Sequence, residues 1–241
     1  MIILLYGIFA YLVGLFGLTY FILFLGGWDF LPLHIHSKVP TDNLQAWLVN
    51  IALMVLFALQ HSVMARPAFK QWLTRLIPAA AERSTYVLLS GVVLLIMCYY
   101  WQPIAGSLWH VDQGLGHSLL VFGYLFGWAF AMIATFLINH FELMGLQQVY
   151  LHVKQLPKPE AHFTERWFYR MVRHPLQLGV LMGIWFTPHM SMTHFSLALT
   201  MTVYILIGLQ FEEKDLAASL GEKYRDYQKR VPMLIPWTKR K

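Results

Sequence analysis

Long apolar segments alternate with short polar ones along the whole chain. A helix needs about 20 mostly apolar residues to cross the hydrocarbon core of a bilayer. The apolar runs lie at about residues 2–25, 44–64, 84–101, 118–139, 176–187 and 193–211. The fifth run is short and is ended by Pro188. The pattern therefore predicts an all-α fold, a polytopic membrane helical bundle of about six crossings with a short fifth one.

The composition supports a membrane protein. Hydrophobic residues make up 58% of the 241 and charged residues 12%, about half the charge of an ordinary soluble domain. The first apolar run has no basic n-region and no A-x-A cleavage site, so we expect it to be retained rather than cleaved as a signal peptide. The single cysteine, Cys98, excludes an intrachain disulfide and a multi-cysteine metal site. We expect one integral membrane domain over residues 1–241.

The basic residues predict the orientation of the crossings. Of 18 Lys and Arg residues, 17 fall in alternate connecting segments, and Lys38 is the exception. The positive-inside rule then places both termini in the cytoplasm. The net charge of +6 follows from this rule and from contact with anionic lipid, and needs no nucleic acid. The residues assigned to the cytoplasmic side are Arg66, Lys70, Arg75, Arg83, Lys154, Lys158, Arg166, Arg170, Arg173, Lys214, Lys223, Arg225, Lys229, Arg230, Lys239, Arg240 and Lys241.

The segment after the sixth run has the period of an amphipathic helix. Its apolar positions recur at steps of three and four residues, namely Leu216, Leu220, Tyr224 and Tyr227. Gly221 interrupts the pattern. We therefore expect a cytoplasmic C-terminal amphipathic helix over about 212–230.

Charged residues flank the hairpin made by the fifth and sixth runs. Arg173-His174-Pro175 precedes the fifth run, and Glu212-Glu213 ends the sixth, so both return to the same membrane face. Proline suits the first turn of a helix, whose free N–H groups and partial positive charge suit an anion. This face can therefore hold a ligand with both a carboxylate and a positive charge. The alternative is a basic stop-transfer flank with a proline cap, and carboxylates that mark the water boundary.

Polar residues also end the second and fourth runs, where they are costly unless paired. Asn139, His140 and Glu142 end the fourth run, and His61 lies near the end of the second. His140 or Glu142 can act as a proton acceptor, although an interfacial histidine is commonly a hydrogen-bonded anchor. His61 and His140 could instead ligate haem, so a haem-binding membrane redox protein is the alternative from another class. The chain has no H-E-x-x-H motif and no Cys/His cluster, and we expect no metal.

Two ordered motifs resemble those of isoprenylcysteine carboxyl methyltransferases and phospholipid methyltransferases. The first motif in that group is R-H-P-x-Y-x-G. In this chain it is matched by Arg173, His174, Pro175, Leu176, Gln177, Leu178 and Gly179, and Gln177 stands where the group usually has Tyr. The second is the E-E-x-x-L…G-x-x-Y…V-P tail, matched by Glu212, Glu213, Leu216, Gly221, Tyr224, Val231 and Pro232. In that group the two motifs bind S-adenosylmethionine.

The resemblance extends over most of the chain to the bacterial methanethiol S-methyltransferases. It is carried by residues 60–67, 82–86, 135–142, 145–150 and 230–234. It implies S-adenosylmethionine-dependent methylation of methanethiol, a small volatile thiol, to dimethyl sulfide at the cytoplasmic side of a bacterial inner membrane. The cofactor-binding part would cover about 139–236. Its binding residues would be Arg173, His174, Pro175, Gln177, Gly179, Glu212, Glu213, Tyr224 and Tyr227, with Gly179 allowing the ligand to approach the backbone.

The chemistry of this reaction requires a base. A thiol with a pKa of about 8.5 or above is mostly protonated at pH 7, and the thiolate is the nucleophile. The candidates are His140, His61 and Glu142, in that order, with Asn139 beside them. A dry site favours a displacement in which opposite charges cancel. The same argument suits a lipid or a prenylated thiol or carboxyl acceptor, which is the alternative within the same fold.

Overall fold

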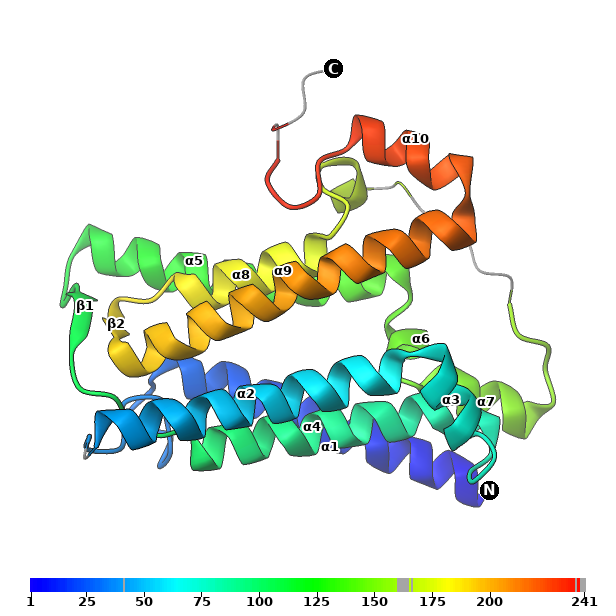
Figure 1. Cartoon of the computed structure of the whole chain (residues 1–241), viewed down its shortest axis with the longest axis horizontal. Coiled ribbons are helices and arrows are strands. Elements are labelled where there is room, and N and C mark those ends of the chain that lie inside the picture. Colours follow the sequence, from blue (N-terminus) through cyan, green and yellow to red (C-terminus); the bar gives the residue numbers. More distant parts are fainter. Residues whose placement is uncertain (41, 160–164, 166, 237, 239–241) are drawn as a thin grey trace. The chain divides into compact units, whose positions relative to one another are not determined.

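The structure is a computed structural model that describes residues 1–40, 42–159, 165, 167–236 and 238 (Figure 1). Four of the basic residues assigned to the cytoplasmic side, Arg166, Lys239, Arg240 and Lys241, lie outside this part of the chain. The described residues are mainly helical, which confirms the predicted fold class.

In the part of the chain that the structure describes, five helices are long and apolar enough to cross a membrane. They are α1 (Ile2–Gly26), α2 (Asn43–Ala65), α4 (Glu82–Tyr100), α5 (Leu115–Ile138) and α9 (Met192–Leu220). The predicted fifth crossing is α8 (Pro175–Trp185), which has 11 residues and is shorter than a span. Six apolar helices therefore occur where the sequence predicts them, and the chain is a multi-pass membrane protein.

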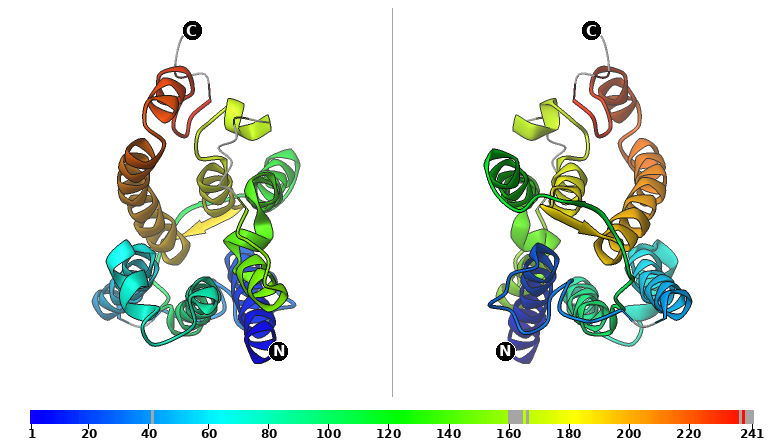
Figure 2. Two further views of the ribbon diagram at one scale, coloured as in Figure 1. Left: turned by 90° about the vertical axis from the view of Figure 1, so that its right-hand side faces the viewer. Right: turned by 90° about the vertical axis from the view of Figure 1, so that its left-hand side faces the viewer.

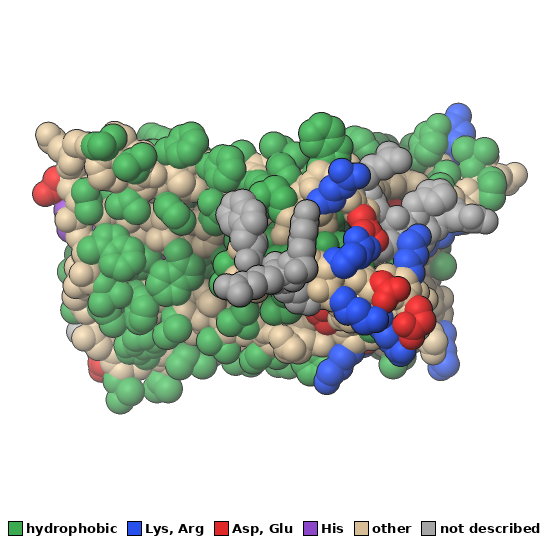
Figure 3. All heavy atoms as spheres, turned by 90° about the horizontal axis from the view of Figure 1, so that it is seen from above, with side chains coloured by type: hydrophobic (Ala, Val, Ile, Leu, Met, Phe, Trp, Pro, Cys, Tyr) green, Lys and Arg blue, Asp and Glu red, His purple; other side chains and the backbone are tan. Residues whose placement is uncertain are grey.

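The long helices carry large hydrophobic side chains that remain exposed in the protein. On α5 they include Leu119, Phe122, Phe126 and Ile133, which recur at helical spacing along one face. On the face drawn in Figure 3, hydrophobic side chains cover a wide area, and Lys and Arg side chains lie together in one region with several Asp and Glu side chains between them. An apolar face of this extent is expected to contact lipid.

The remaining elements are short. They are α3 (Pro67–Leu73), η1 (Ala79–Ala81), β1 (Ser107–His110), α6 (His140–Leu143), α7 (Leu146–Lys154), η2 (Trp167–Arg170), β2 (His189–Ser191) and α10 (Glu222–Arg230). Strands β1 and β2 pair in a two-stranded sheet.

The chain divides into two compact units. Unit 1 comprises Met1–Leu108, Asn139–Ala161 and Ser191–Leu197, and unit 2 comprises Trp109–Ile138, His162–Met190 and Ala198–Lys241. The single domain over residues 1–241 remains a prediction.

In unit 1, α1 and α2 each pack along α4. Glycines allow α1 to approach α4 closely: a Cβ atom on Gly17 would lie 2.5 Å from the carbonyl oxygen of Gly91. Such close approach through small residues is the common packing mode of membrane helices.

In unit 2, α5 packs along α8, the green and yellow helices of Figures 1 and 2. Gly127, Gly179 and Gly183 line this contact. The predicted C-terminal helix begins within α9, which continues unbroken past Glu212 to Leu220. The chain turns at Gly221, whose φ of 61° suits glycine, and α10 follows.

Candidate functional site

The segment before α8 pairs with the C-terminal tail in unit 2. The backbone N–H of Arg173 donates to the carbonyl of Pro232 at 2.9 Å, and that of His174 donates to Met233 at 3.1 Å. His174 occupies the N-cap position of α8 without a side-chain capping bond, and Pro175 occupies the first turn, as the sequence predicts. The start of α8 and the tail after α10 are thereby fixed to each other.

Arg173 joins this pairing to α9. Its guanidinium donates from Nε to Oε1 of Glu213 at 2.9 Å and from Nη2 to Oε2 at 2.7 Å, a bidentate geometry. Nη1 donates to the carbonyls of Gln228 and Val231 at 3.2 and 2.5 Å. The side chain is only 8% exposed, so its charge depends on these acceptors. The two stretches that the sequence predicts to return to one membrane face are therefore in direct contact.

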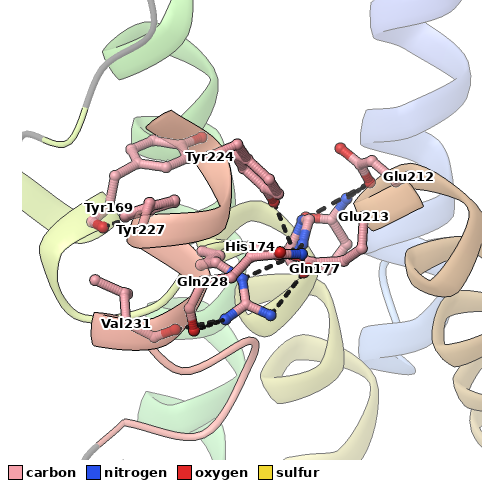
Figure 4. Close-up of polar contacts among 10 residues, drawn as sticks. Tyr169, His174, Gln177, Glu212, Glu213, Tyr224, Tyr227, Gln228 and Val231 are labelled. Atoms are coloured by element: carbon pink, nitrogen blue, oxygen red, sulfur yellow. Dashed lines mark hydrogen bonds and ion pairs between the residues drawn. The ribbon is translucent and has the colours of Figure 1, made fainter. Parts of the chain in front are cut away.

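Glu213 is the centre of the network in Figure 4. Besides Arg173, it accepts from Nε2 of His174 at 2.5 Å, from the hydroxyl of Tyr224 at 2.8 Å and from Nε2 of Gln228 at 2.6 Å. A carboxylate offers about four lone-pair sites, and five donors reach this one. Because the side chain is also only 10% exposed, the hydrogen-bonding capacity of the Glu213 carboxylate is taken up by groups of the protein itself.

Glu212 is the opposite case, although it is the next residue. Its side chain is 47% exposed. Gln177 donates to it from Nε2 at 3.3 Å, and Nδ1 of His174 lies 3.7 Å from the same Oε2 atom. The second distance is too long for a hydrogen bond. Glu212 is thus oriented from the first turn of α8 while its carboxylate faces outward.

Tyr224 and Tyr227, which the resemblance places among the binding residues, have their side chains buried inside the protein, and their role in binding remains a prediction. Both are 2% exposed, and Tyr227 donates to the carbonyl of Tyr169 at 2.5 Å. Burial raises the pKa of both phenols, and for Tyr224 the hydrogen bond to Glu213 raises it further. Each hydroxyl is therefore a neutral donor that fastens α10 to the rest of unit 2.

Gly179 lies against α5. A Cβ atom at this position would lie 2.6 Å from the carbonyl oxygen of Gly127 and from the backbone nitrogen of Ala131, both on α5. The missing side chain allows α8 to contact α5, because helix packing leaves no room for another atom. Gly179 therefore serves α5 packing, and its role in ligand approach remains a prediction.

The proposed catalytic residues all belong to unit 1 and form two clusters. In the first, Nε2 of His61 shares a hydrogen bond of 2.7 Å with the hydroxyl of Tyr86. Nδ1 of His61 lies 3.5 Å from Oγ of Ser90, and the ring stacks on Phe57. These contacts are those expected of a histidine that anchors its helix through hydrogen bonds. A haem iron bound to Nε2 of His61 would have to displace the hydroxyl of Tyr86.

The second cluster surrounds His140. Its Nε2 lies 3.2 Å from the hydroxyl of Tyr11. His140 is the first residue of α6, and it is buried in the protein. Burial lowers the pKa of His140 below its ordinary value of 6.5, so the ring is neutral at pH 7. A neutral imidazole is a competent proton acceptor.

Asn139 and Glu142 support the turn that carries His140. The side-chain oxygen of Asn139 accepts from the backbone N–H of Glu142 at 3.1 Å, which caps α6. The amide of Asn139 donates to Glu142 and to Gln147. Asn139 therefore has a capping role, and Glu142 accepts one of its hydrogen bonds.

Sequence reasoning missed several members of these networks. Gln228 follows Tyr224 by four residues, so helical spacing places it on the face that holds Glu213. The carbonyls of Val231 and Tyr169 carry no sequence signal because every residue has one. Tyr11 contacts His140 across 129 positions, a pairing that only the fold determines. Among the residues that the structure describes, no group of three potential metal ligands occurs.

Comparison with known proteins identifies the family. The sequence pattern described as NnrU protein matches residues 49–231. The chain belongs to this family. Relatives named methanethiol S-methyltransferase include those of Crocosphaera subtropica, 44% identical over 99% of this chain and 93% of the relative, and Mycobacterium tuberculosis, 45% identical over 98% and 96%. A relative of the same name from Pseudomonas deceptionensis is 49% identical over 81% of this chain and 74% of its own. No solved structure matches.

Proposed function

We propose that the protein transfers a methyl group from S-adenosylmethionine to methanethiol, forming dimethyl sulfide. The contact of the α8 start with the end of α9, through Arg173 and Glu213, carries the proposal. It gathers on one side of unit 2 the two motifs whose resemblance implies an adenosyl donor. The names of the relatives support the acceptor and the reaction.

Unit 2 has groups that fit both ends of an amino acid. Glu212 presents an exposed carboxylate, which attracts an ammonium group. Gln177 holds this carboxylate at the first turn of α8, where N–H groups without acceptors in the helix suit a carboxylate. In the proposal, Glu212, Gln177 and the α8 start hold the amino-acid end of the donor.

The bound donor would supply an activated methyl group on a sulfonium. The thiol of methanethiol must lose its proton before its sulfur can attack that methyl group. The candidates for accepting this proton remain those of the sequence, His140, His61 and Glu142 in that order, and the lowered pKa of His140 keeps its ring mainly neutral at pH 7. From His140 the proton would then pass to water, and the imidazole would return to its neutral form.

The proposed setting is the bacterial inner membrane, with both termini in the cytoplasm. The alternation of basic segments along the chain supports this orientation. A polar, charged donor would enter from the cytoplasm, whereas methanethiol is small and apolar enough to arrive through the bilayer. The same access suits a lipid or prenylated acceptor. Inhibition of methanethiol methylation by a larger thiol would reveal such an acceptor site.

The test is formation of dimethyl sulfide by the purified protein in lipid nanodiscs. We expect headspace dimethyl sulfide that depends on both S-adenosylmethionine and methanethiol. The Glu222→Gln variant is a matched control, because this exposed α10 carboxylate pairs only with the exposed Arg225 among the contacts seen here. It should retain full activity, and a wild-type protein that forms no product above the enzyme-free background would refute the proposal.

A further inference from the structure

The adjacent carboxylates Glu212 and Glu213 have very different surroundings. Glu213 receives five hydrogen bonds and is 10% exposed. Glu212 is 47% exposed and receives one hydrogen bond, of 3.3 Å, from Gln177. Figure 4 shows Glu213 directed into the network and Glu212 at its edge. This geometry indicates that the two carboxylates have different roles in ligand binding.

We propose that Glu212 binds the α-ammonium group of the adenosyl donor, whereas Glu213 is a positioning residue that does not touch it. This inference rests on the proposed function and divides its binding site between two neighbouring residues.

Charge supports the assignment of Glu212. The negative charge of Glu213 is matched within the protein by the guanidinium of Arg173, with which it makes a bidentate pair. Among the described residues, Glu212 contacts the amide of Gln177 and lies near the ring of His174, beyond hydrogen-bond distance, and its other charged neighbours are the carboxylates of Glu213 and Asp215. An additional cation is therefore attracted to Glu212. A new bond to Glu213 would have to replace one of its five donors.

Glu213 acts on the site through His174. Because a carboxylate can only accept, Nε2 of His174 carries a hydrogen and donates it to Oε1 of Glu213 at 2.5 Å. This leaves Nδ1 directed toward Glu212. Glu213 thus fixes both the orientation of the ring beside Glu212 and, through Arg173, the start of α8.

Gln177 completes the division of roles. It belongs to the first turn of α8, and its amide reaches Glu212 from another helix. Loss of this bond would leave the Glu212 side chain more conformational freedom to lose on binding. The Gln177→Leu variant should therefore bind the ammonium less tightly than wild type, by a smaller factor than a change at Glu212 itself.

Two probe ligands separate the ammonium contact from the other contacts. S-adenosylhomocysteine carries the amino-acid end, and 5′-methylthioadenosine has the same nucleoside and thioether without it. Affinities are measured calorimetrically on the full chain in nanodiscs. Glu212→Gln should weaken S-adenosylhomocysteine by about 10–100-fold, the range for a hydrogen bond to a charged group. The affinity for 5′-methylthioadenosine should change less than twofold.

The positioning role has its own spectroscopic readout. In ¹⁵N-histidine spectra of the ligand-free protein, Glu213→Gln should shift the His174 Nε2 signal, whereas Glu212→Gln should leave Nε2 protonated. A purely structural defect that left the His174–residue 213 contact intact would not produce this selective change. Glu213→Asp should restore the wild-type pattern in part, because it keeps the accepting carboxylate.

The outcomes distinguish the inference from the function beneath it. If wild type binds S-adenosylhomocysteine and Glu212→Gln binds it equally well, the division of roles is wrong and the function stands. A loss of 5′-methylthioadenosine binding in Glu212→Gln would also overturn the ammonium contact. If wild type binds neither ligand, both the proposed function and the Glu212 assignment fail. An unchanged His174 spectrum in Glu213→Gln would refute the positioning role.

Discussion

Replacement of Glu213 by Gln should destabilise the protein more than any change at a surface carboxylate. The substitution keeps the shape of the side chain but exchanges one accepting oxygen for an amide that donates. Donors from Arg173, His174, Tyr224 and Gln228 all face this position. At least one of them would meet another donor, and the guanidinium of Arg173 would lose its counter-charge while 8% exposed.

The expected magnitude follows from the burial of this pair. Breaking a buried ion pair by removal of one partner costs about 3–5 kcal/mol. For a chain of this size, each kcal/mol lowers the melting temperature by roughly 2–4 °C, so we expect a decrease of about 6–20 °C. Glu222→Gln is the control, because its ion pair with Arg225 is largely exposed and should contribute about 0–1 kcal/mol.

A double-mutant cycle isolates the pair itself. Arg173→Met and Glu213→Gln are combined, and unfolding is followed by intrinsic tryptophan fluorescence in one detergent. The structure predicts a coupling energy of at least about 1.5 kcal/mol, because both side chains belong to one network. Additive effects, or a loss of less than about 1 kcal/mol in Glu213→Gln, would refute the reasoning.

Three further predictions concern other parts of the chain. His140 has a pKa below 6.5 in the folded protein, so below about pH 6.5 the unfolded state binds more protons than the folded state. The free energy of unfolding should therefore decrease as the pH is lowered. In melting curves recorded at different pH values, His140→Gln should show a smaller decrease. Gly179→Val should lower the unfolding free energy by about 1–3 kcal/mol or more in chemical unfolding, since α5 leaves no space for a side chain, and wild-type stability would contradict this packing. Tyr224→Phe removes one of five donors to Glu213 and should cost about 1 kcal/mol in the same assay, while leaving the bidentate contact with Arg173.

Much of the fold is predictable from local properties of the sequence. Apolar runs gave the crossings because burial in lipid requires both length and apolarity in one continuous segment. The short α8 was evident from Pro188, and the break at Gly221 from the interrupted period. The continuity of α9 past Glu212 was not evident, because a charged pair after an apolar run can mark either the end of a helix or a helix that leaves the membrane and continues.

The candidate site was predictable in its members more than in their roles. Sequence order alone indicated that Arg173 and Glu213 would lie at the same membrane face, since a hairpin returns both to it, but it did not indicate that the two side chains would pair. It gave no means of distinguishing Glu212 from Glu213, because their difference depends on Gln228, Tyr224 and the helical phase of α9. Tertiary packing likewise decided that Gly179 faces α5.

The central claim is that the start of α8 and the end of the apolar part of α9 hold the adenosyl donor. Hydrogen–deuterium exchange of the protein in nanodiscs, with and without S-adenosylhomocysteine, tests this most directly. We predict slower exchange on ligand addition at residues 173–179 and 212–216, and no change along the exposed face of α10. Protection confined to other segments, or none at saturating ligand, would contradict the account.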